Sequence, residues 1–410
     1  MKTEGKYSEI MSYREYRSPK RQERERKERR KRKHDTSDVI LSPPDNSLII
    51  IVTFLVVLGF LAIFSATAPK CLRDGVSLVS FLVKQIIFAG IGVGAMCFFM
   101  NYDYKKLEKH NKNFLWIVIG LLLILQFTPL GVTINGAKRW INLVVFQLQP
   151  SELAKPLFCM LLASLFKDKI DLNTLLKNLW VIIPMLLIIG LILKQPNLSM
   201  AVILSATTLA VYIAARGPWM PIIAGSGLLG VGVLTKLSSL LHGYQMDRIT
   251  AWLDPTSDAL GKGYNIIQSL IAFASGRIFG TGYGSSIQKL AYLPECHTDF
   301  IYAIIAEEFG FLGCLFILVL FVALVHRGMR IAKRCPEMYG KLLAIGITFV
   351  FGFQAFANMA VASSFFPVTG VTLPFISYGG TSIIVSLAMV GILLNISKQR
   401  IKKLRTENEQ

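Results

Sequence analysis

The chain has 410 residues, of which 53% are hydrophobic and only 17% are charged, whereas a soluble domain carries nearer a quarter charged residues. Its apolar residues gather in runs of about 20, the length of helix that crosses a hydrocarbon core of about 30 Å. The formal net charge of +19 could indicate nucleic acid, but most basic residues lie in the first segment or flank the apolar runs. These features argue against a soluble enzyme and against nucleic acid as a partner. They predict an all-α integral membrane protein.

Residues 1–46 form a basic tail ahead of the first apolar run. Residues 2–33 hold 14 Lys and Arg, and segment 21–33 contains no aromatic residue. Because the tail has no core-forming pattern, we expect a disordered cytoplasmic segment that lies on anionic membrane lipids. Specific binding of RNA or of a partner protein is the alternative. No signal peptide is predicted, because no small-residue cleavage site follows the first apolar run.

The membrane domain is predicted to span residues 47–398, with about ten crossings and a short cytoplasmic tail at 399–410. Since lipid offers no hydrogen-bond partner to the backbone, each crossing should be helical. If the N-terminus is inside, the inner loops and the C-terminal tail hold 18 basic residues, against 10 in the outer loops. This asymmetry predicts that both termini are cytoplasmic. The predicted crossings lie near residues 47–67, 80–100, 113–129, 151–166, 178–193, 198–215, 219–235, 299–325, 341–362 and 376–396.

A large outer loop, residues 236–298, separates the seventh and eighth crossings. Connections of about 60 residues are uncommon in compact proteins and are usually functional. Two shorter outer loops, 130–150 and 363–376, are also rich in polar residues, Pro and Gly. The six cysteines form no CxxC pair and no metal-binding spacing, so neither a disulfide framework nor a cysteine metal site is predicted.

The long loop ends in three polar residues that alternate at the predicted membrane surface: Glu295, His297 and Asp299. Such a cluster at an interface is typical of proton-transfer chemistry, so Asp299 and Glu295 are our candidate catalytic residues and His297 a substrate contact. The alternative is that Thr298 or Asp299 caps the following helix. Further along that helix, Glu307 and Glu308 are costly in an apolar span. We expect structural pairing for one of them, with a catalytic role as the alternative.

Basic residues beside the outer loops are candidates for binding phosphate. Arg139 lies in the 130–150 loop, and Lys155 lies about one turn into the next predicted helix. Arg grips phosphate with a planar fork and Lys acts as a compact point charge. For Lys155, an extended side chain whose ammonium reaches the membrane surface is an equally weighted alternative.

The long loop and the last outer loop supply the remaining candidates. The long loop contains four glycines in Gly276-Arg-Ile-Phe-Gly280-Thr-Gly-Tyr-Gly284, which indicate a flexible or re-entrant turn more than a phosphate cradle. The prolines and the Gly379-Gly380 pair of the last loop predict irregular backbone that is buried in protein or lines a cavity. The candidate substrate-binding residues in these loops are Arg248, Gln268, Lys289 and Ser377.

Four segments together resemble the SEDS family of membrane proteins, which includes FtsW, RodA and SpoVE. They are Gly136–Ile141 with Gln149–Lys155, Gly263–Leu270, Tyr292–Phe300 and Pro374–Gly380. The resemblance covers about residues 47–398, and the stretch Gln288–Glu295 is more similar to FtsW than to RodA. The family's usual Gln-Pro-Asp-x-Gly is here Gln195-Pro-Asn197-Leu-Ser199, and Arg277 stands where small or acidic residues are usual.

The resemblance implies a ten-helix peptidoglycan glycosyltransferase in the bacterial cytoplasmic membrane. It would polymerise lipid II at the outer face, act on undecaprenyl-pyrophosphate-linked glycan, and work with a class B penicillin-binding transpeptidase and other division proteins. The family's essential aspartate falls on Asp299. No cofactor is assigned, and a divalent cation (Mg²⁺ or Mn²⁺) stays open.

The residues themselves are compatible with that chemistry. An acid near the outer surface could take the proton of the acceptor hydroxyl, and cations could hold the leaving pyrophosphate, where charge develops. Two alternatives remain from the sequence. One is a lipid II flippase, in which Glu307, Glu308 and Lys155 line a polar path. The other is a non-catalytic division scaffold that recruits partners through its basic tail.

Overall fold

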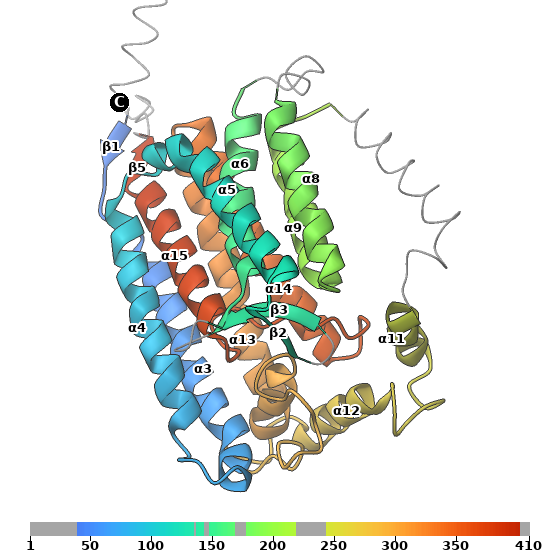
Figure 1. The fold of residues 1–410 in the computed structure, drawn as a ribbon. Coiled ribbons are helices and arrows are strands. Elements are labelled where there is room, and N and C mark those ends of the chain that lie inside the picture. Colours follow the sequence, from blue (N-terminus) through green and yellow to red (C-terminus); the bar gives the residue numbers. More distant parts are fainter. Residues whose placement is uncertain (1–38, 135–136, 143–146, 169–177, 219–242, 402–410) are drawn as a thin grey trace, which may run out of the picture.

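The computed structural model describes residues 39–134, 137–142, 147–168, 178–218 and 243–401. The described chain is mostly helical (Figure 1). Six of its helices are long and apolar enough to cross a membrane, and α8 (Leu179–Lys194) and α9 (Leu198–Ala214) are shorter apolar helices. The six are α3 (Asn46–Arg73), α4 (Ser80–Asn101), α5 (Tyr104–Phe127), α13 (Ile301–Arg334), α14 (Met338–Ala362) and α15 (Gly380–Ser397).

The predicted crossings can be compared with these elements wherever the chain is described. Nine of the ten overlap a helix, the fourth matching α6 (Pro150–Phe166). The remaining one, 219–235, lies outside the described residues. The long loop carries two helices of its own, α11 (Gly243–Leu253) and α12 (Tyr264–Gly276). The prediction of an all-α chain missed five short strands.

The strands mark the two ends of the molecule. β1 (Val39–Leu41) pairs antiparallel with β5 (Gln399–Ile401), so both ends of the described chain lie on one face, here called the chain-end face (Figure 1). At the other end, the loop face, β2 (Gly131–Ile134), β3 (Ala137–Asn142) and β4 (Gln147–Leu148) form an antiparallel sheet. The loop face also carries α12 and the connections that precede α13 and α15 (Figure 1).

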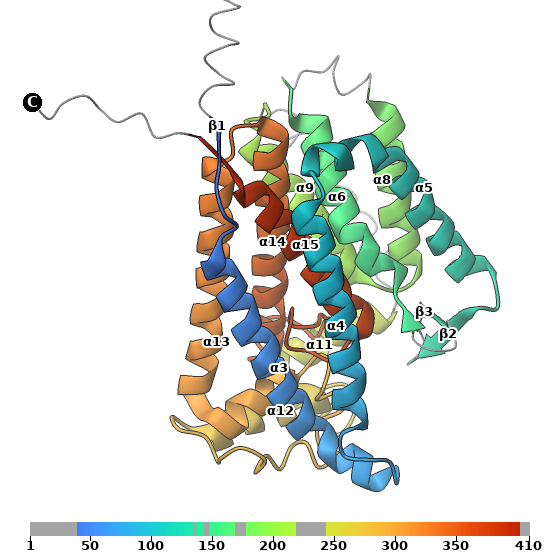
Figure 2. The ribbon, with the colours of Figure 1, turned by 90° about the vertical axis from the view of Figure 1, so that its left-hand side faces the viewer.

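The bundle has a buried centre and an apolar outside. Nearly every residue of α6 is buried, as are most residues of α14 and α15, and α15 lies along α4 (Figure 2). By contrast, α3, α4 and α5 expose large apolar side chains such as Phe54, Ile91 and Ile117. Apolar surface of this extent is costly in water and ordinary in lipid. The chain is therefore a multi-pass membrane protein.

Helix α13 is broken at Gly310, where φ is 66° and ψ is −162°. A Cβ atom at this position would lie 2.4 Å from the amide nitrogen of Gly280, so only glycine fits. The loop after α12 provides partners for the groups that the break frees, as membrane-embedded backbone requires. Four bonds join them: Phe311 N–H to Arg277 O (2.9 Å), Leu312 N–H to Ile278 O (3.2 Å), Thr281 N–H to Glu307 O (2.9 Å) and Gly282 N–H to Glu308 O (3.1 Å).

The six cysteines are all free, and five of them are buried. These five pack inside the bundle, whereas Cys97 is exposed.

Candidate functional site

Asp299 lies at the loop face in a series of turns that leads into α13, and its side chain is half-buried. It does not cap the helix: the N-cap residue is Phe300, and no side chain bonds to the first-turn amides. The capping alternative is therefore wrong. The Asp299 carbonyl accepts a 2.8 Å hydrogen bond from Asn358 Nδ2, which also donates to Val371 O at 2.6 Å. One amide on α14 thus positions the backbone at Asp299 against the last loop.

The Asp299 carboxyl group is poised to exchange a proton near neutral pH. Burial raises its pKa to about 6, and the nearby negative charge of Glu295 acts in the same direction. Arg139 and Arg248 oppose this rise, because their positive charges favour the ionised carboxylate. A general base works best when its pKa lies near the operating pH, and Asp299 meets that condition.

The two arginines whose charges act on the Asp299 carboxyl lie on different elements of the chain. Arg139 lies on β3, and its guanidinium donates to the carbonyls of Gln195 (3.3 Å) and Pro196 in the turn before α9. Arg248 lies on α11 and donates to Val368 O at 2.9 Å. Both side chains are half-buried. The structure therefore brings together three sequence-predicted site residues that are far apart in the chain.

Lys155 does not face outward, although both sequence-based alternatives, phosphate binding and extension to the membrane surface, expected it to. Its side chain is only 1% exposed, so it does not extend to the membrane surface. The ammonium group forms a 2.5 Å ion pair with Glu152 and donates to Gln354 Oε1 at 3.0 Å. Gln354 in turn donates to Thr372 O at 2.9 Å. Lys155 thereby supports the last loop from inside the bundle, and its binding of phosphate stays a prediction.

His297 is held among aromatic rings beside the carboxylates. Its ring centroid lies 5.9 Å from those of Phe81 and Tyr378. Burial lowers the pKa of the imidazole, the charge of Lys70 lowers it further, and Glu295 opposes both. His297 is therefore neutral at pH 7 and can donate or accept a hydrogen bond.

Ser377 joins the last loop to the segment that carries Asp299. Its hydroxyl donates to Thr298 O at 2.6 Å and accepts from the Leu373 amide at 2.8 Å. Tyr378 adds a backbone bond of 3.0 Å to His297 O. These contacts make Ser377 a positioning residue in this structure, and direct contact with substrate stays a prediction.

The two glutamates of α13 hold the end of the long loop. Lys289 Nζ lies 2.8 Å from Glu308 Oε1 and 2.8 Å from Ser65 Oγ on α3. Glu307 accepts hydrogen bonds from the Ser286 hydroxyl and from the Ile287 amide (2.9 Å). The expected structural pairing of at least one glutamate is confirmed. Lys289 is itself buried, so its proposed contact with substrate stays untested.

The remaining candidates do not join the cluster around Asp299 through any hydrogen bond within the described chain. Gln268 is half-buried on α12, and Arg277 is exposed at the end of that helix, with φ at 47°. In the glycine run, a Cβ atom at Gly276 would lie 1.9 Å from Ala306 O, and one at Gly280 would lie 2.1 Å from Glu308 O. The first two glycines of the run therefore allow close packing of backbone on α13.

Sequence reasoning missed the residues that support the site. Gln354 and Asn358 lie four residues apart on apolar α14, so they share one face. That spacing could have identified them from the sequence. Lys70, near the end of α3, lowers the pKa of His297, but no sequence pattern identified it. Among the described residues, no group of three or more His, Cys, Asp or Glu side chains could hold a metal ion.

The fold and site define a multi-pass membrane protein whose outer bundle helices are apolar and whose loop face holds one carboxylate in the field of two arginines. A family model described as a cell cycle protein, and covering FtsW, RodA and SpoVE, matches residues 45–402. The chain belongs to this family.

Similar proteins from two bacteria agree with that assignment. The chain is 40% identical to the probable peptidoglycan glycosyltransferase FtsW of Trichlorobacter lovleyi, over 87% of this chain and 94% of the relative. It is 39% identical to the stage V sporulation protein E of Bacillus subtilis, over 87% and 97%.

Solved structures show the same fold. One is a chain of a peptidoglycan synthase complex that coordinates polymerization and crosslinking, with a TM-score of 0.70 and 29% identity over 86% of this chain and 97% of that chain. Another is the rod shape determining protein RodA of Thermus thermophilus, with a TM-score of 0.63 and 27% identity over 86% and 96%.

Proposed function

We propose that this protein is a peptidoglycan glycosyltransferase that polymerises lipid II into glycan strands during cell division. The observation that carries the proposal is the Asp299 carboxyl, half-buried at the loop face with its pKa raised to about 6 and two arginines close by. The family membership and the names of the relatives support it.

In the proposed reaction, Asp299 acts as the general base. It takes the proton from the sugar hydroxyl of the acceptor while that oxygen forms a bond to the anomeric carbon of the donor. The bond from the anomeric carbon to the lipid pyrophosphate breaks, and its electron pair leaves with the phosphate oxygen. Arg139 and Arg248 are placed to stabilise this negative charge, which develops on the phosphate oxygen in the transition state. One base and a stabilised leaving group suffice for such an inverting displacement.

The proposal includes a place and an orientation. We place the loop face outside the bacterial cytoplasmic membrane and the chain-end face inside, with about ten crossings. The basic residues support this orientation, and the pairing of β1 with β5 supports an even number of crossings. The solved peptidoglycan synthase complex, which crosslinks as well as polymerises, supports a class B penicillin-binding transpeptidase as partner. A requirement for Mg²⁺ or Mn²⁺ stays open, and comparing activity with and without a chelator decides it.

Purified protein with labelled lipid II tests the proposal. Polymer is the expected product; translocation across vesicles without polymer would indicate the flippase, and neither activity the scaffold. Asp299→Asn should lose at least about 100-fold in polymerisation, the low end of general-base contributions. Asp74→Asn, which removes an exposed carboxylate outside the site, is the matched control and should keep wild-type activity. An Asp299→Asn protein that polymerises at a near wild-type rate would overturn the assignment of the base.

A further inference from the structure

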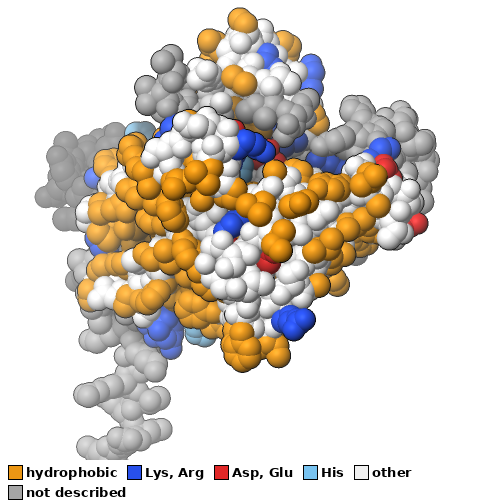
Figure 3. Space-filling model, turned by 90° about the horizontal axis from the view of Figure 1, so that it is seen from below, with side chains coloured by type: hydrophobic (Ala, Val, Ile, Leu, Met, Phe, Trp, Pro, Cys, Tyr) orange, Lys and Arg blue, Asp and Glu red, His pale blue; other side chains and the backbone are white. Residues whose placement is uncertain are grey.

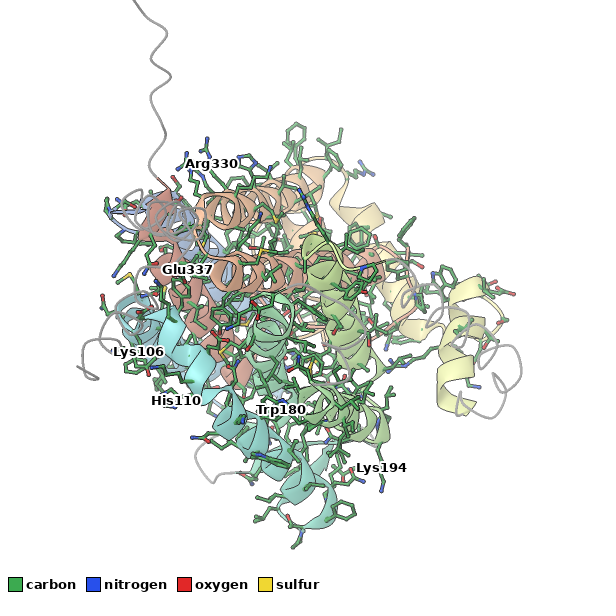
Figure 4. The ribbon with its side chains drawn as sticks, turned by 90° about the horizontal axis from the view of Figure 1, so that it is seen from above. Lys106, His110, Trp180, Lys194, Arg330 and Glu337 are labelled. Atoms are coloured by element: carbon green, nitrogen blue, oxygen red, sulfur yellow. The ribbon has the colours of Figure 1, made fainter. Side chains whose placement is uncertain are left out.

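A cavity of about 270 Å³ opens between α5, α6 and α8. Its lining includes the first turns of α5 and α8. Both helices begin at the chain-end face, whereas α13, which follows Asp299, begins at the loop face (Figure 1). Figure 4 looks onto the chain-end face and shows Trp180 of α8 next to α5. The lining residues used below are Glu108, Lys109, Lys112, Ser164 and Trp180.

The cavity carries two lysines that no carboxylate neutralises within the described chain. Lys109 and Lys112 are three residues apart on α5, so their Cβ atoms are neighbours on one helix face, about 5–6 Å apart. The Lys112 ammonium lies 4.4 Å from the centre of the Trp180 ring, which holds it at the cavity instead of leaving it free in solvent.

Among the described lining residues, Glu108 is the single acid, and it already has partners. Glu108 Oε1 accepts from Lys167 Nζ at 2.7 Å and from Ser164 Oγ at 2.9 Å. It therefore offers little repulsion to an incoming anion, and the described lining keeps a net positive charge.

Exposed apolar surface continues from this cavity towards the middle of the bundle. One turn below Lys112, Trp116 is 64% exposed, and on α8 the side chains of Ile183 and Leu186 are exposed by 58% and 62%. Exposed Trp residues beside lysines are typical of the boundary between hydrocarbon and headgroups. A cationic cavity that leads onto an apolar surface matches one class of ligand, an anion with hydrocarbon chains.

We propose that this cavity binds the phosphate of an anionic phospholipid in the leaflet next to the chain-end face. Lys109 and Lys112 bind the phosphate oxygens, Trp180 packs against the glycerol region, and the acyl chains lie along α5 and α8. Inorganic phosphate shares the charged part of this chemistry but would gain nothing from the apolar surface. The site is independent of the proposed polymerase activity.

Binding of phosphatidylglycerol to the purified protein in detergent tests this site, measured by native mass spectrometry and by thermal stabilisation. Phosphatidylcholine and inorganic phosphate are the comparison ligands. The wild-type protein should bind phosphatidylglycerol saturably, and Lys109→Gln/Lys112→Gln should weaken binding about 25-fold, from a factor of about 5 for each basic residue. Lys106→Gln/Lys333→Gln changes the charge equally at two exposed lysines that do not line the cavity, and should bind as wild type.

The charge-conserving Lys109→Arg/Lys112→Arg variant separates loss of binding from loss of folding, and it should retain most of the affinity. Equal affinity of the wild-type and Gln variants for phosphatidylglycerol would overturn the proposal, as would stabilisation by inorganic phosphate equal to that by the lipid. Polymerisation of lipid II in detergent should be the same in all these variants. A failure of this proposal would therefore leave the test of Asp299 unaffected.

Discussion

The raised pKa of Asp299 makes a prediction about pH that can be worked out in both directions. A general base must be ionised, so the rate of lipid II polymerisation should rise with pH through about 6, the pKa of this carboxyl. About nine-tenths of the molecules are then active at pH 7 and about one-tenth at pH 5. An Asp with an ordinary pKa of about 3.9 would show no such loss at pH 5.

Two substitutions should move the rising limb of this pH–rate profile, the part where the rate increases with pH, in opposite directions. Glu295→Gln removes a negative charge that raises the Asp299 pKa, so the limb moves to lower pH. Arg139→Gln removes a positive charge that lowers it, so the limb moves to higher pH. Burial, the largest cause, is left in place by Glu295→Gln, which should therefore keep the limb above the ordinary Asp value. A limb at the same pH in the wild-type protein and both variants would refute the assignment to Asp299.

The same pKa has a consequence for stability. The folded carboxyl binds its proton more tightly than the unfolded one, so the free energy of unfolding falls as pH rises from about 4 to about 6. The pKa change from 3.8 to about 6 corresponds to about 3 kcal/mol at most. Asp299→Asn should thus raise the Tm at pH 7.5 and leave it nearly unchanged at about pH 3, below both pKa values. A lower Tm at pH 7.5 would mean that the ionised carboxylate stabilises the fold.

Three further predictions concern the architecture. Cysteine introduced within 240–295 should react with an impermeant label from outside, and cysteine within 327–340 only from inside; reversed labelling would put Asp299 on the wrong side for lipid II. Lys155→Ala should destabilise the protein by about 3–5 kcal/mol, because it leaves a buried carboxylate unpaired. The double variant Lys155→Met/Glu152→Gln should recover most of the lost Tm. Equal Tm values for Lys155→Ala and the double variant would disprove the pairing. Gly310→Ala should lower both Tm and polymerisation, since only glycine fits the break in α13; a wild-type Tm would contradict that geometry.

The sequence predicted the helices well because hydropathy and helix length are local properties of the chain. It missed the β2–β4 sheet because that segment alternates too irregularly to indicate strands. It also gave no sign of the break in α13. The break depends on backbone bonds to the loop at 277–282, which lies about 30 residues earlier in the chain.

The candidate site was predictable in its residue types more than in its contacts. Asp299 and Arg139 stood out as charged residues beside predicted crossings, and the fold brings them together. Lys155 and Lys289 also stood out, but both ammonium groups turn inward to glutamates. Only the packing of neighbouring helices decides whether a cation beside a loop faces substrate or a buried acid. No local feature of the sequence distinguishes these two arrangements.

The break at Gly310 divides α13 into a long part, residues 311–334, and a short part, residues 301–309, here called the arm, and the loop at 277–289 bonds to both parts. Residues 301–309 are bound through Glu307 and Glu308 to the segment 281–289, and Asp299 lies directly before the arm. The same loop also accepts, through the Arg277 and Ile278 carbonyls, hydrogen bonds from the amides of Phe311 and Leu312 beyond the break. It therefore fixes the angle between the two parts of α13, and with it the position of the Asp299 carboxylate relative to the arginines. The geometry at Asp299 is thus set by a loop from earlier in the chain as well as by the helices of the bundle.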